Sequence, residues 1–334
     1  MRAPMSSFPA TAPHPATLRV AYRDATPDAL LAAPGTLAVF GFGDAAPALH
    51  GDPRYLHVAL PAHGRAPLEC WRVDGEVAHG RSDGIAWSEG GGLQFGALEI
   101  ADDGDIDTIA RQAYARLQTW LAASTHPHVL RIWNYMDAIT EGEGDAERYR
   151  RFCVGRARGI GREQPPQELP AATAIGHPHA SGCFQLYWLA ARRAGTPLEN
   201  PRQVQAWRYP RQYGPQAPGF ARALLPAEAS MPLLLSGTAA VVGHASQHGD
   251  SLEAQLDEVL ANLRSLIDTA RVQRPALPAQ PGAGSVLKVY VRDAEAMARV
   301  DALMAQHLPE VPRIVLHAHV CRRELAVEID GVHA

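Results

Sequence analysis

Apolar residues along this chain repeat with two different spacings. Between residues 106 and 123, and again from residue 252, they recur every three or four positions, which predicts two amphipathic helices. Shorter stretches of apolar and β-branched residues, bounded by Gly, Pro and Asp, predict strands. Before the first helix these predicted strands are residues 18–22, 37–42, 56–60, 68–73 and 93–100.

The order of the predicted elements then occurs twice. The first set is a helix at 106–123, a strand at 129–135, a helix at 148–154 and a strand pair within 172–189. The second set is the helix from 252, a strand at 286–291, a helix at 293–306 and a strand pair within 313–332. VLRIWNY at Val129 aligns with VLKVYVR at Val286, and HPHASGCFQLYW at His177 aligns with HAHVCRRELAVE at His317. The pattern predicts an α/β (α+β) protein of two similar units, each a mixed sheet covered on one face by helices.

Four segments follow from this division. Residues 1–16 are rich in Pro and Ala and are expected to be flexible. Residues 17–195 form the predicted N-terminal domain and residues 233–334 the C-terminal one. Between them, residues 196–232 carry many prolines, aromatics and arginines, and a long connection of this kind usually lines a functional site.

Length, charge and cysteine spacing exclude several classes of protein. The 334 residues are enough for two domains, and the net charge of -4 argues against a nucleic-acid binder. No apolar run is long enough to span a membrane, and the N-terminus lacks a signal peptide. The cysteines, at positions 70, 153, 183 and 321, form no close pair, which favours reduced thiols and a cytoplasmic protein.

Glu328 and Cys321 are the first candidates for chemistry. Glu328 is a carboxylate among apolar residues of a predicted strand, and it either lies on a solvated face or sits in a partly apolar pocket. In a pocket its pKa would rise, and it would serve as a general acid. Cys321 is either a small buried apolar residue or a lining residue of the same pocket, and no nearby base marks it as a nucleophile.

Histidines raise the alternative of a metal site. His317 and His319 share one strand face, as do His177 and His179 in the first unit. The sequence shows no third ligand, so we expect no metal. A two-residue turn in the last strand pair would place His317 opposite Glu328, whereas a longer turn would not.

Arginines beside aromatic and apolar residues predict anion binding. They are Arg148, Arg156, Arg158, Arg208, Arg211 and Arg222. Because guanidinium groups pair bidentately with carboxylates, two or more of them indicate a substrate with more than one acidic group.

Several motifs in order resemble the chorismatase family, in particular its 3-hydroxybenzoate synthase members. They are NYMDAI, ERYRRFCVGR, QVQAWRYPRQYGPQAPGFARA, SGTAAVVGH and CRRELAVEIDG, and the resemblance runs from about residue 93 to the C-terminus. The C-terminal unit also resembles the RidA/YjgF fold. The resemblance implies that the chain converts chorismate, an enolpyruvyl ether with two carboxylates, to 3-hydroxybenzoate, alone or with 4-hydroxybenzoate, and pyruvate.

The resemblance also implies residue roles. Glu328 matches the essential acid, Cys321 matches the cysteine of the hydroxybenzoate-forming branch, and Ala239 and Ala240 lie where the branches differ. Arg148, Arg156 and Arg222 are expected to hold the carboxylates, with Tyr209 and Tyr213 beside the ring. No cofactor or metal is required.

Two other functions remain open at this point. One is hydrolysis of chorismate to a dihydroxycyclohexadiene acid and pyruvate. The other is a RidA-like small-molecule binder or imine deaminase, although Val320 and Cys321 occupy the stretch where that group uses an arginine. RidA-like units commonly form trimers, but two units in one chain satisfy some of those contacts, so we expect a monomer or a trimer without a nucleic-acid or membrane partner.

Overall fold

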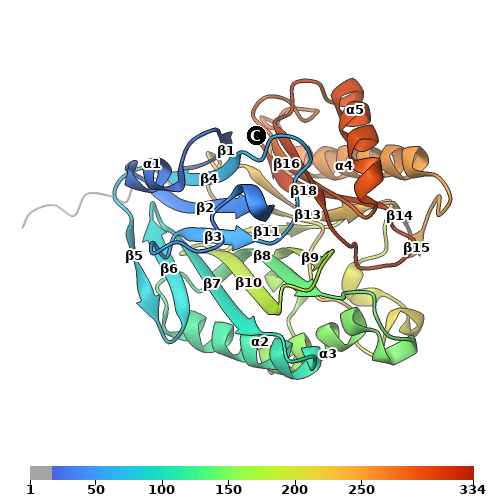
Figure 1. Cartoon of the computed structure of the whole chain (residues 1–334), viewed down its shortest axis with the longest axis horizontal. Helices are drawn as coiled ribbons and strands as arrows, with labels where there is room; N and C mark the ends of the chain where they lie inside the picture. Colours follow the sequence, from blue (N-terminus) through green and yellow to red (C-terminus); the bar gives the residue numbers. More distant parts are fainter. Residues whose placement is uncertain (1–16) are drawn as a thin grey trace, which may run out of the picture.

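The structure is a computed structural model that describes residues 17–334. The predicted flexible segment at residues 1–16 lies outside this described part. Within it, three larger sheets of four, six and six strands and five α-helices surround a common interior (Figure 1). None of these helices is long and apolar enough to cross a bilayer.

The β-rich opening region forms a sheet of its own. Its strands are β1 (Leu18–Arg23), β2 (Thr36–Phe42), β3 (Tyr55–Val58) and β4 (Leu68–Val73), and helix α1 (Pro27–Ala32) joins the first two. They lie in the order β1-β4-β2-β3. All seven residues of β2 are buried because one face of this strand packs into the interior and the other against α1 and β3. The four strands predicted here from the apolar pattern are all present.

Two six-stranded sheets follow, and their strand orders correspond. The first contains β5 (Ala78–Ser82), β6 (Ile85–Gly90), β7 (Leu93–Ala101), β8 (His128–Asp137), β9 (Ala171–His177) and β10 (Cys183–Ala191). The second contains β11 (Thr196–Leu198), β12 (Ala223–Leu225), β13 (Leu233–Ala239), β16 (Val286–Val291), β17 (Arg313–His317) and β18 (Val327–His333). The orders β5-β6-β7-β10-β8-β9 and β11-β12-β13-β18-β16-β17 match position by position, which confirms two similar α/β units.

The predicted strand pairs are wrong in one respect. β17 and β18 do not pair with each other, because β16 lies between them, parallel to β17 and antiparallel to β18. In the first unit β8 separates β9 from β10 in the same way. The cause is the helix before each pair: a strand that follows a crossover helix returns parallel to the strand before the helix and takes its free edge. The last strand then enters on the other side.

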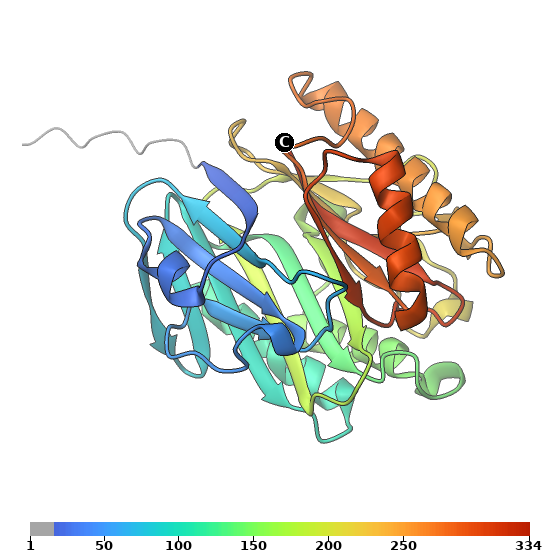
Figure 2. The same ribbon diagram turned by 45° about the horizontal axis from the view of Figure 1, so that its top comes forward.

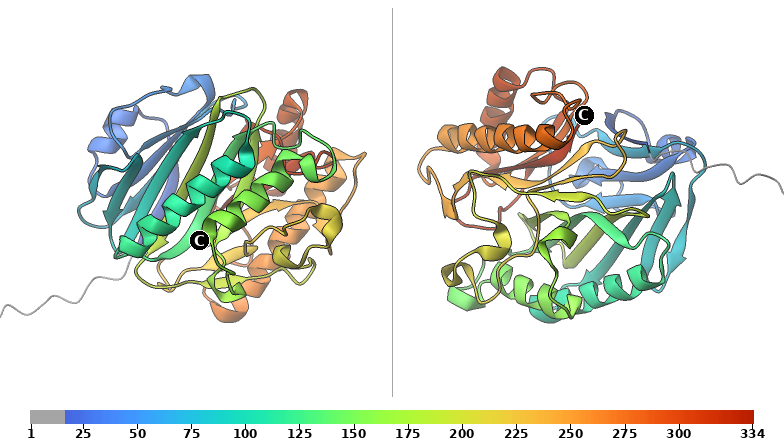
Figure 3. Two further views of the ribbon diagram at one scale, coloured as in Figure 1. Left: turned by 90° about the horizontal axis from the view of Figure 1, so that it is seen from below. Right: turned by 180° about the vertical axis from the view of Figure 1, so that it is seen from behind.

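Helices cover one face of each sheet. Helix α2 (Ile106–Ala123) has the predicted bounds, and α3 (Arg148–Ile160) continues six residues beyond its predicted end, to a left-handed glycine at Gly161. The two lie side by side over the first sheet (Figure 3). Helices α4 (Leu252–Gln273) and α5 (Met297–His307) cover the second sheet in the same manner (Figure 2).

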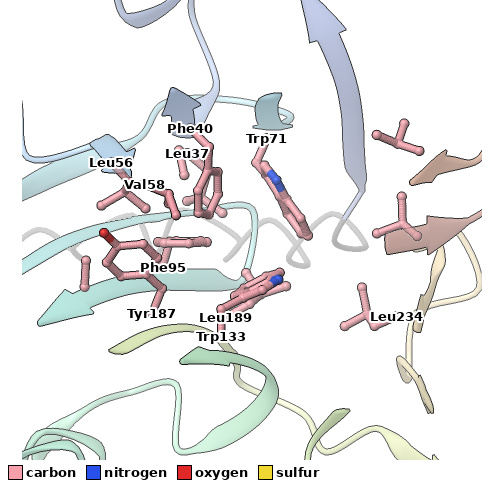
Figure 4. Packing of buried hydrophobic residues seen from close by; sticks show 14 of the residues in the cluster. Leu37, Phe40, Leu56, Val58, Trp71, Phe95, Trp133, Tyr187, Leu189 and Leu234 are labelled. Atoms are coloured by element: carbon pink, nitrogen blue, oxygen red, sulfur yellow. The ribbon is translucent and has the colours of Figure 1, made fainter. Parts of the chain in front are cut away.

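The uncovered faces of the two large sheets meet the N-terminal sheet in one shared core. Trp71, Phe40, Trp133, Tyr187 and, from the second sheet, Leu234 point into it (Figure 4). The ring centroids of Trp71 and Trp133 lie 5.4 Å apart at a near-perpendicular angle. This packing fixes the two units against each other and therefore also fixes the side chains that meet between them. A small ribbon of β14 (Val241–Val242) and β15 (Ala245–Ser246) follows β13.

Candidate active site

A pocket with a mainly apolar lining lies where the two units meet. It is a cavity of about 330 Å³, within the range of small-molecule sites. The first unit lines it from α3 and β9, and the second from β13, β18 and the loop at residues 321–325. The aromatic connection at residues 196–232 supplies a further wall, with Tyr209, Tyr213, Phe220 and Arg222.

Glu328 lies on β18 and points into this pocket. It is 5% exposed, and its neighbours in the sheet are Ala239 on β13 and Tyr290 on β16. Its Oε1 atom lies only 2.0 Å from the place that a β-carbon at Gly237 would take, so the carboxyl fits because position 237 has no side chain. Burial, with a smaller contribution from the negative charge of Asp330, raises the pKa of Glu328 to about 8. The carboxyl is therefore mostly neutral at pH 7, as a general acid requires.

Asp330, two residues further along β18, belongs to a buried charged network. Its Oδ2 accepts hydrogen bonds from Arg131 Nη2 (2.9 Å), Thr173 Oγ1 (2.7 Å) and the Tyr290 hydroxyl (3.1 Å). Lys288 Nζ lies 3.4 Å from the other oxygen. The network thus joins β8 and β9 of the first unit to β16 and β18 of the second.

Cys321 contributes an apolar surface rather than a nucleophile. It lines the pocket and packs against the helical cores of both units. Burial, and then the nearby Glu328 charge, raises the pKa of its thiol to about 12. Because the thiolate is the reactive form, a thiol with this pKa is chemically inert near neutral pH. Its bulk and low polarity are what it offers to a ligand.

Arg156 and Arg222 present guanidinium groups to the pocket. Each is less than one-tenth exposed, and within residues 17–334 no carboxylate lies at salt-bridge distance from either. Arg222 Nη2 donates to the Tyr209 hydroxyl (2.7 Å) and to the Val204 carbonyl (2.9 Å), while its Nε atom is buried without a partner. Burial raises the pKa of the nearby Glu199 carboxyl to about 7, so Glu199 supplies only part of a counter-charge. Both cations are therefore available to an anionic ligand.

Arg148 does not belong to this group, and its expected role in substrate binding is wrong. Its guanidinium donates to the Asp102 carboxylate (2.5 Å) and to the carbonyls of Asp137 (3.0 Å) and Gly104 (2.8 Å). These bonds hold the start of α3 against the loop before α2. The side chain does not line the pocket, because its charge and its donors are already used.

Tyr209 and Tyr213 lie at the mouth of the pocket, 5.4 Å apart between ring centroids. Tyr209 contacts Arg222 on one side and Arg322 on the other, with guanidinium-to-ring distances of 5.5 and 5.2 Å. Arg322 also lies 4.0 Å from the Tyr213 ring, and the Tyr213 hydroxyl lies 3.1 Å from His244 Nδ1. The aromatic connection is thus attached to the loop that carries Cys321.

Ala240 does not line the pocket. It is fully buried in the core beneath α4, whereas the preceding residue, Ala239, faces Glu328 across the sheet. The interpretation of position 240 as a pocket residue is therefore replaced by Ala239 and Gly237. The two-residue periodicity of β13 places 237 and 239 on the same face, and this spacing is the signal that identifies them.

The histidine pairs lie away from the pocket. His317 does not face Glu328, because β16 lies between their strands, and its Nε2 atom lies 3.2 Å from the Arg292 carbonyl oxygen. His179 and His317 have ring centroids 6.1 Å apart at the edge where β9 and β17 approach each other. Over residues 17–334 no group of three or more His, Cys, Asp or Glu side chains is arranged to hold a metal ion.

Sequence reasoning missed several lining residues. Thr173, Gln203, Phe220, Gly237 and Arg322 all line the pocket. Four of them, Gln203, Phe220, Gly237 and Arg322, lie within motifs already singled out, so membership of these motifs was an available signal. Thr173 carries no sequence signal, since its position depends on how the two units pack.

Comparisons with known proteins identify relatives of this chain. Residues 69–190 match the family model "Chorismatase FkbO/Hyg5-like, N-terminal". The chain is 35% identical to 3-hydroxybenzoate synthase of Streptomyces hygroscopicus, over 85% of this chain and 86% of that protein. It is 34% identical to a chorismatase of Streptomyces rapamycinicus, over 80% of this chain and 82% of that protein.

Solved structures extend the comparison to the whole molecule. A chorismatase crystal structure superimposes with a TM-score of 0.80 and 29% identity, covering 98% of this chain and 100% of that one. A member of the YjgF protein family from Neisseria meningitidis matches over 34% of this chain and 86% of its own, at 18% identity and a TM-score of 0.27. The assignment of two similar units depends on the repeated strand order rather than on that last similarity.

Proposed function

The chain belongs to the chorismatase family and is an enzyme that acts on chorismate; we propose that it forms 3-hydroxybenzoate and pyruvate, with Glu328 as the proton donor. The observation that carries the proposal is a buried carboxyl, neutral at physiological pH, facing a pocket that also holds two guanidinium groups without a full counter-charge.

The pocket chemistry corresponds to the substrate. Chorismate carries two carboxylates, and Arg156 and Arg222 supply a cation for each. Tyr209 and Tyr213 contribute ring surface and hydroxyl groups beside the cyclohexadiene. Binding would thereby hold the enolpyruvyl group within reach of Glu328, and a fixed geometry of this kind lowers the barrier to reaction.

Proton transfer from Glu328 starts the reaction. The proton goes to the methylene carbon of the enolpyruvyl ether and leaves an oxocarbenium centre on the adjacent carbon. The glutamate carboxylate that remains offsets this positive charge in a pocket of low polarity. Cleavage of the bond between the ring carbon and the ether oxygen then gives pyruvate, whose carbonyl keeps that oxygen. In the aromatising branch the ring hydroxyl moves to the vacated carbon, and the ring loses one proton, which restores the acid form of Glu328.

The aromatic product requires no added water, whereas hydrolysis to the dihydroxy diene acid consumes one molecule. Cys321 fills part of the pocket wall with a neutral thiol, and a site that excludes water favours the aromatising outcome. For this reason we propose 3-hydroxybenzoate as the main product, with 4-hydroxybenzoate as a minor one.

The test is to incubate the purified protein with chorismate in the presence of a chelator. Pyruvate is followed with a coupled dehydrogenase, and the ring product is identified by chromatography against authentic standards. We expect pyruvate and total hydroxybenzoate in equal amounts, with 3-hydroxybenzoate as the main isomer, and no turnover with Glu328→Gln. The matched control Glu310→Gln changes an exposed carboxylate and should retain full activity. The dihydroxy diene acid as main product would assign hydrolysis, and absence of pyruvate would reject both reactions.

A further inference from the structure

We propose that the Asp330 carboxylate is a positioning residue, which occupies the Arg131 guanidinium behind Glu328 and so leaves Glu328 as the proton donor. This inference rests on the proposed function, because it explains how Glu328, the acid in that function, is kept neutral. Asp330 itself does not reach the pocket, so it acts through its neighbour.

The two carboxyls share one face of β18, since they are two residues apart on a strand. Thr173 connects them to β9. Its hydroxyl donates to Asp330, and it lies 3.4 Å from the same hypothetical β-carbon of Gly237 that approaches Glu328 Oε1. Arg131 therefore interacts electrostatically with both carboxyls, but it is hydrogen-bonded to Asp330.

The buried network is neutral without Glu328. It contains two cations, Arg131 and Lys288, and two carboxylates, Asp330 and Glu69; Lys288 Nζ lies 3.0 Å from Glu69 Oε2. All four side chains are at most 2% exposed. Because both cations are already paired with a carboxylate, their charges are largely offset at Glu328, and the Arg131 charge lowers its pKa only in part. A fifth charge at this depth would lack a partner, and a buried carboxyl without a partner remains protonated.

The remaining groups around Glu328 do not change this conclusion. Cys321 and Tyr149 are neutral near pH 7, because burial raises the pKa of each. Strand β13 carries no titratable side chain, and β16 contributes Tyr290 and Lys288 on the Asp330 side. Of the two cations that act on Glu328, Arg131 is paired with Asp330, whereas Arg222 has no carboxylate at salt-bridge distance within residues 17–334.

Because Arg222 also binds substrate in the proposed function, the protonation of Glu328 should depend on whether substrate is bound. Arg131 and Arg222 are the two cations that lower the pKa of Glu328. A substrate carboxylate bound to Arg222 offsets one of them, and the acid then holds its proton more firmly in the complex than in the free enzyme. The alkaline limb of kcat should accordingly lie at higher pH than the alkaline limb of kcat/KM.

The decisive variant is Asp330→Asn. It retains the shape but removes the charge that occupies Arg131, so Glu328 should ionise at lower pH. One elementary charge removed at ~7 Å, with an effective dielectric constant of about 20, predicts a shift of the alkaline limb by roughly one to two pH units. The matched control is Glu69→Gln, which removes a carboxylate from the same network on the far side of Lys288. The alkaline limb of the pH profile of Glu69→Gln should move by less than about half a pH unit.

Ionisation of Glu328 is also measured without catalysis. The infrared C=O stretch of the neutral carboxyl, assigned by its loss in Glu328→Gln, is followed against pH in the ligand-free protein. The stretch should disappear near pH 8 in the wild type and at lower pH in Asp330→Asn. If no pyruvate forms from chorismate, the proposed function fails, and this titration still decides the inference.

Three results would overturn the inference. The first is an Asp330→Asn titration that matches Glu69→Gln in folded protein. The second applies if Asp330→Asn does not fold. Arg131→Gln is then examined, and a Glu328 titration that does not move to higher pH in this variant overturns the inference. The third needs only the wild type, in which a Glu328 carboxyl already ionised at pH 7 excludes the proposal.

Discussion

Replacing Glu328 by glutamine should stabilise the folded protein in alkaline solution and change its stability much less in mild acid. Burial and the Asp330 charge raise the pKa of Glu328 from 4.5 to about 8. In this interval the folded state keeps a proton that the unfolded chain has lost. The contribution of the carboxyl to stability is therefore fully present below pH 4.5 and is lost as the pH rises toward 8.

The magnitude follows from the size of this interval. Each pKa unit corresponds to ~1.4 kcal/mol, so the wild type should lose on the order of 4 kcal/mol relative to Glu328→Gln between about pH 5 and about pH 8.5. A typical domain is stable by only about 5–15 kcal/mol, which makes such a difference easy to measure. The same substitution should abolish turnover, so the acid is retained at a cost in stability.

The assay is equilibrium unfolding in urea of the ligand-free wild type and Glu328→Gln at both pH values. Tryptophan fluorescence reports the transition, because Trp71, Trp133 and Trp188 are almost fully buried. Subtracting the two proteins at each pH removes the contribution of every other titrating group. Glu310→Gln, at an exposed position, should show no pH-dependent difference. A Glu328→Gln difference of equal size at both pH values would refute the reasoning.

Four further substitutions test the pocket. Cys321→Ala should change the ratio of ring products more than the rate of pyruvate release, and an unchanged ratio would remove its steering role. Gly237→Ala places a β-carbon 2.0 Å from Glu328 Oε1, so kcat should fall at least about tenfold with an unchanged circular dichroism spectrum; retained kcat would contradict the geometry. Arg222→Gln should raise KM for chorismate roughly tenfold or more, whereas Tyr209→Phe removes one hydroxyl and should raise KM less. Equal effects of these two would argue against a carboxylate contact at Arg222.

The sequence predicts which residues share a face of a helix or strand better than it predicts which strands lie next to each other. The apolar stripe of α2 has no competing interpretation, and its bounds are confirmed at both ends. Alternation in β18 correctly identifies Glu328 as a carboxyl among apolar residues, but it does not say which strand lies beside it. The insertion of β16 between β17 and β18 is set by the crossover through α5, and no pattern within β18 records this.

Long-range charge pairing limits the prediction of the site in the same way. Arg148 and Arg222 have similar aromatic and apolar neighbours in sequence, yet Arg148 is bound by a carboxylate 46 residues away, and Arg222 has no such partner within residues 17–334. The Arg131–Asp330 pair spans 199 residues. Only the packing of the two units determines which cations remain available to a ligand.

The repeated strand order has a consequence for how such a catalyst arises. Glu328 lies between Ala239 and Tyr290, and the corresponding place in the first unit, between Ala97 and Trp133, is taken by Tyr187. Two identical subunits meeting about a symmetry axis would each have to present the same residue there. Joined in one polypeptide, the halves are free to differ, so that in the proposed mechanism one donates the proton and the other supplies a wall and a cation for a substrate that has no symmetry of its own.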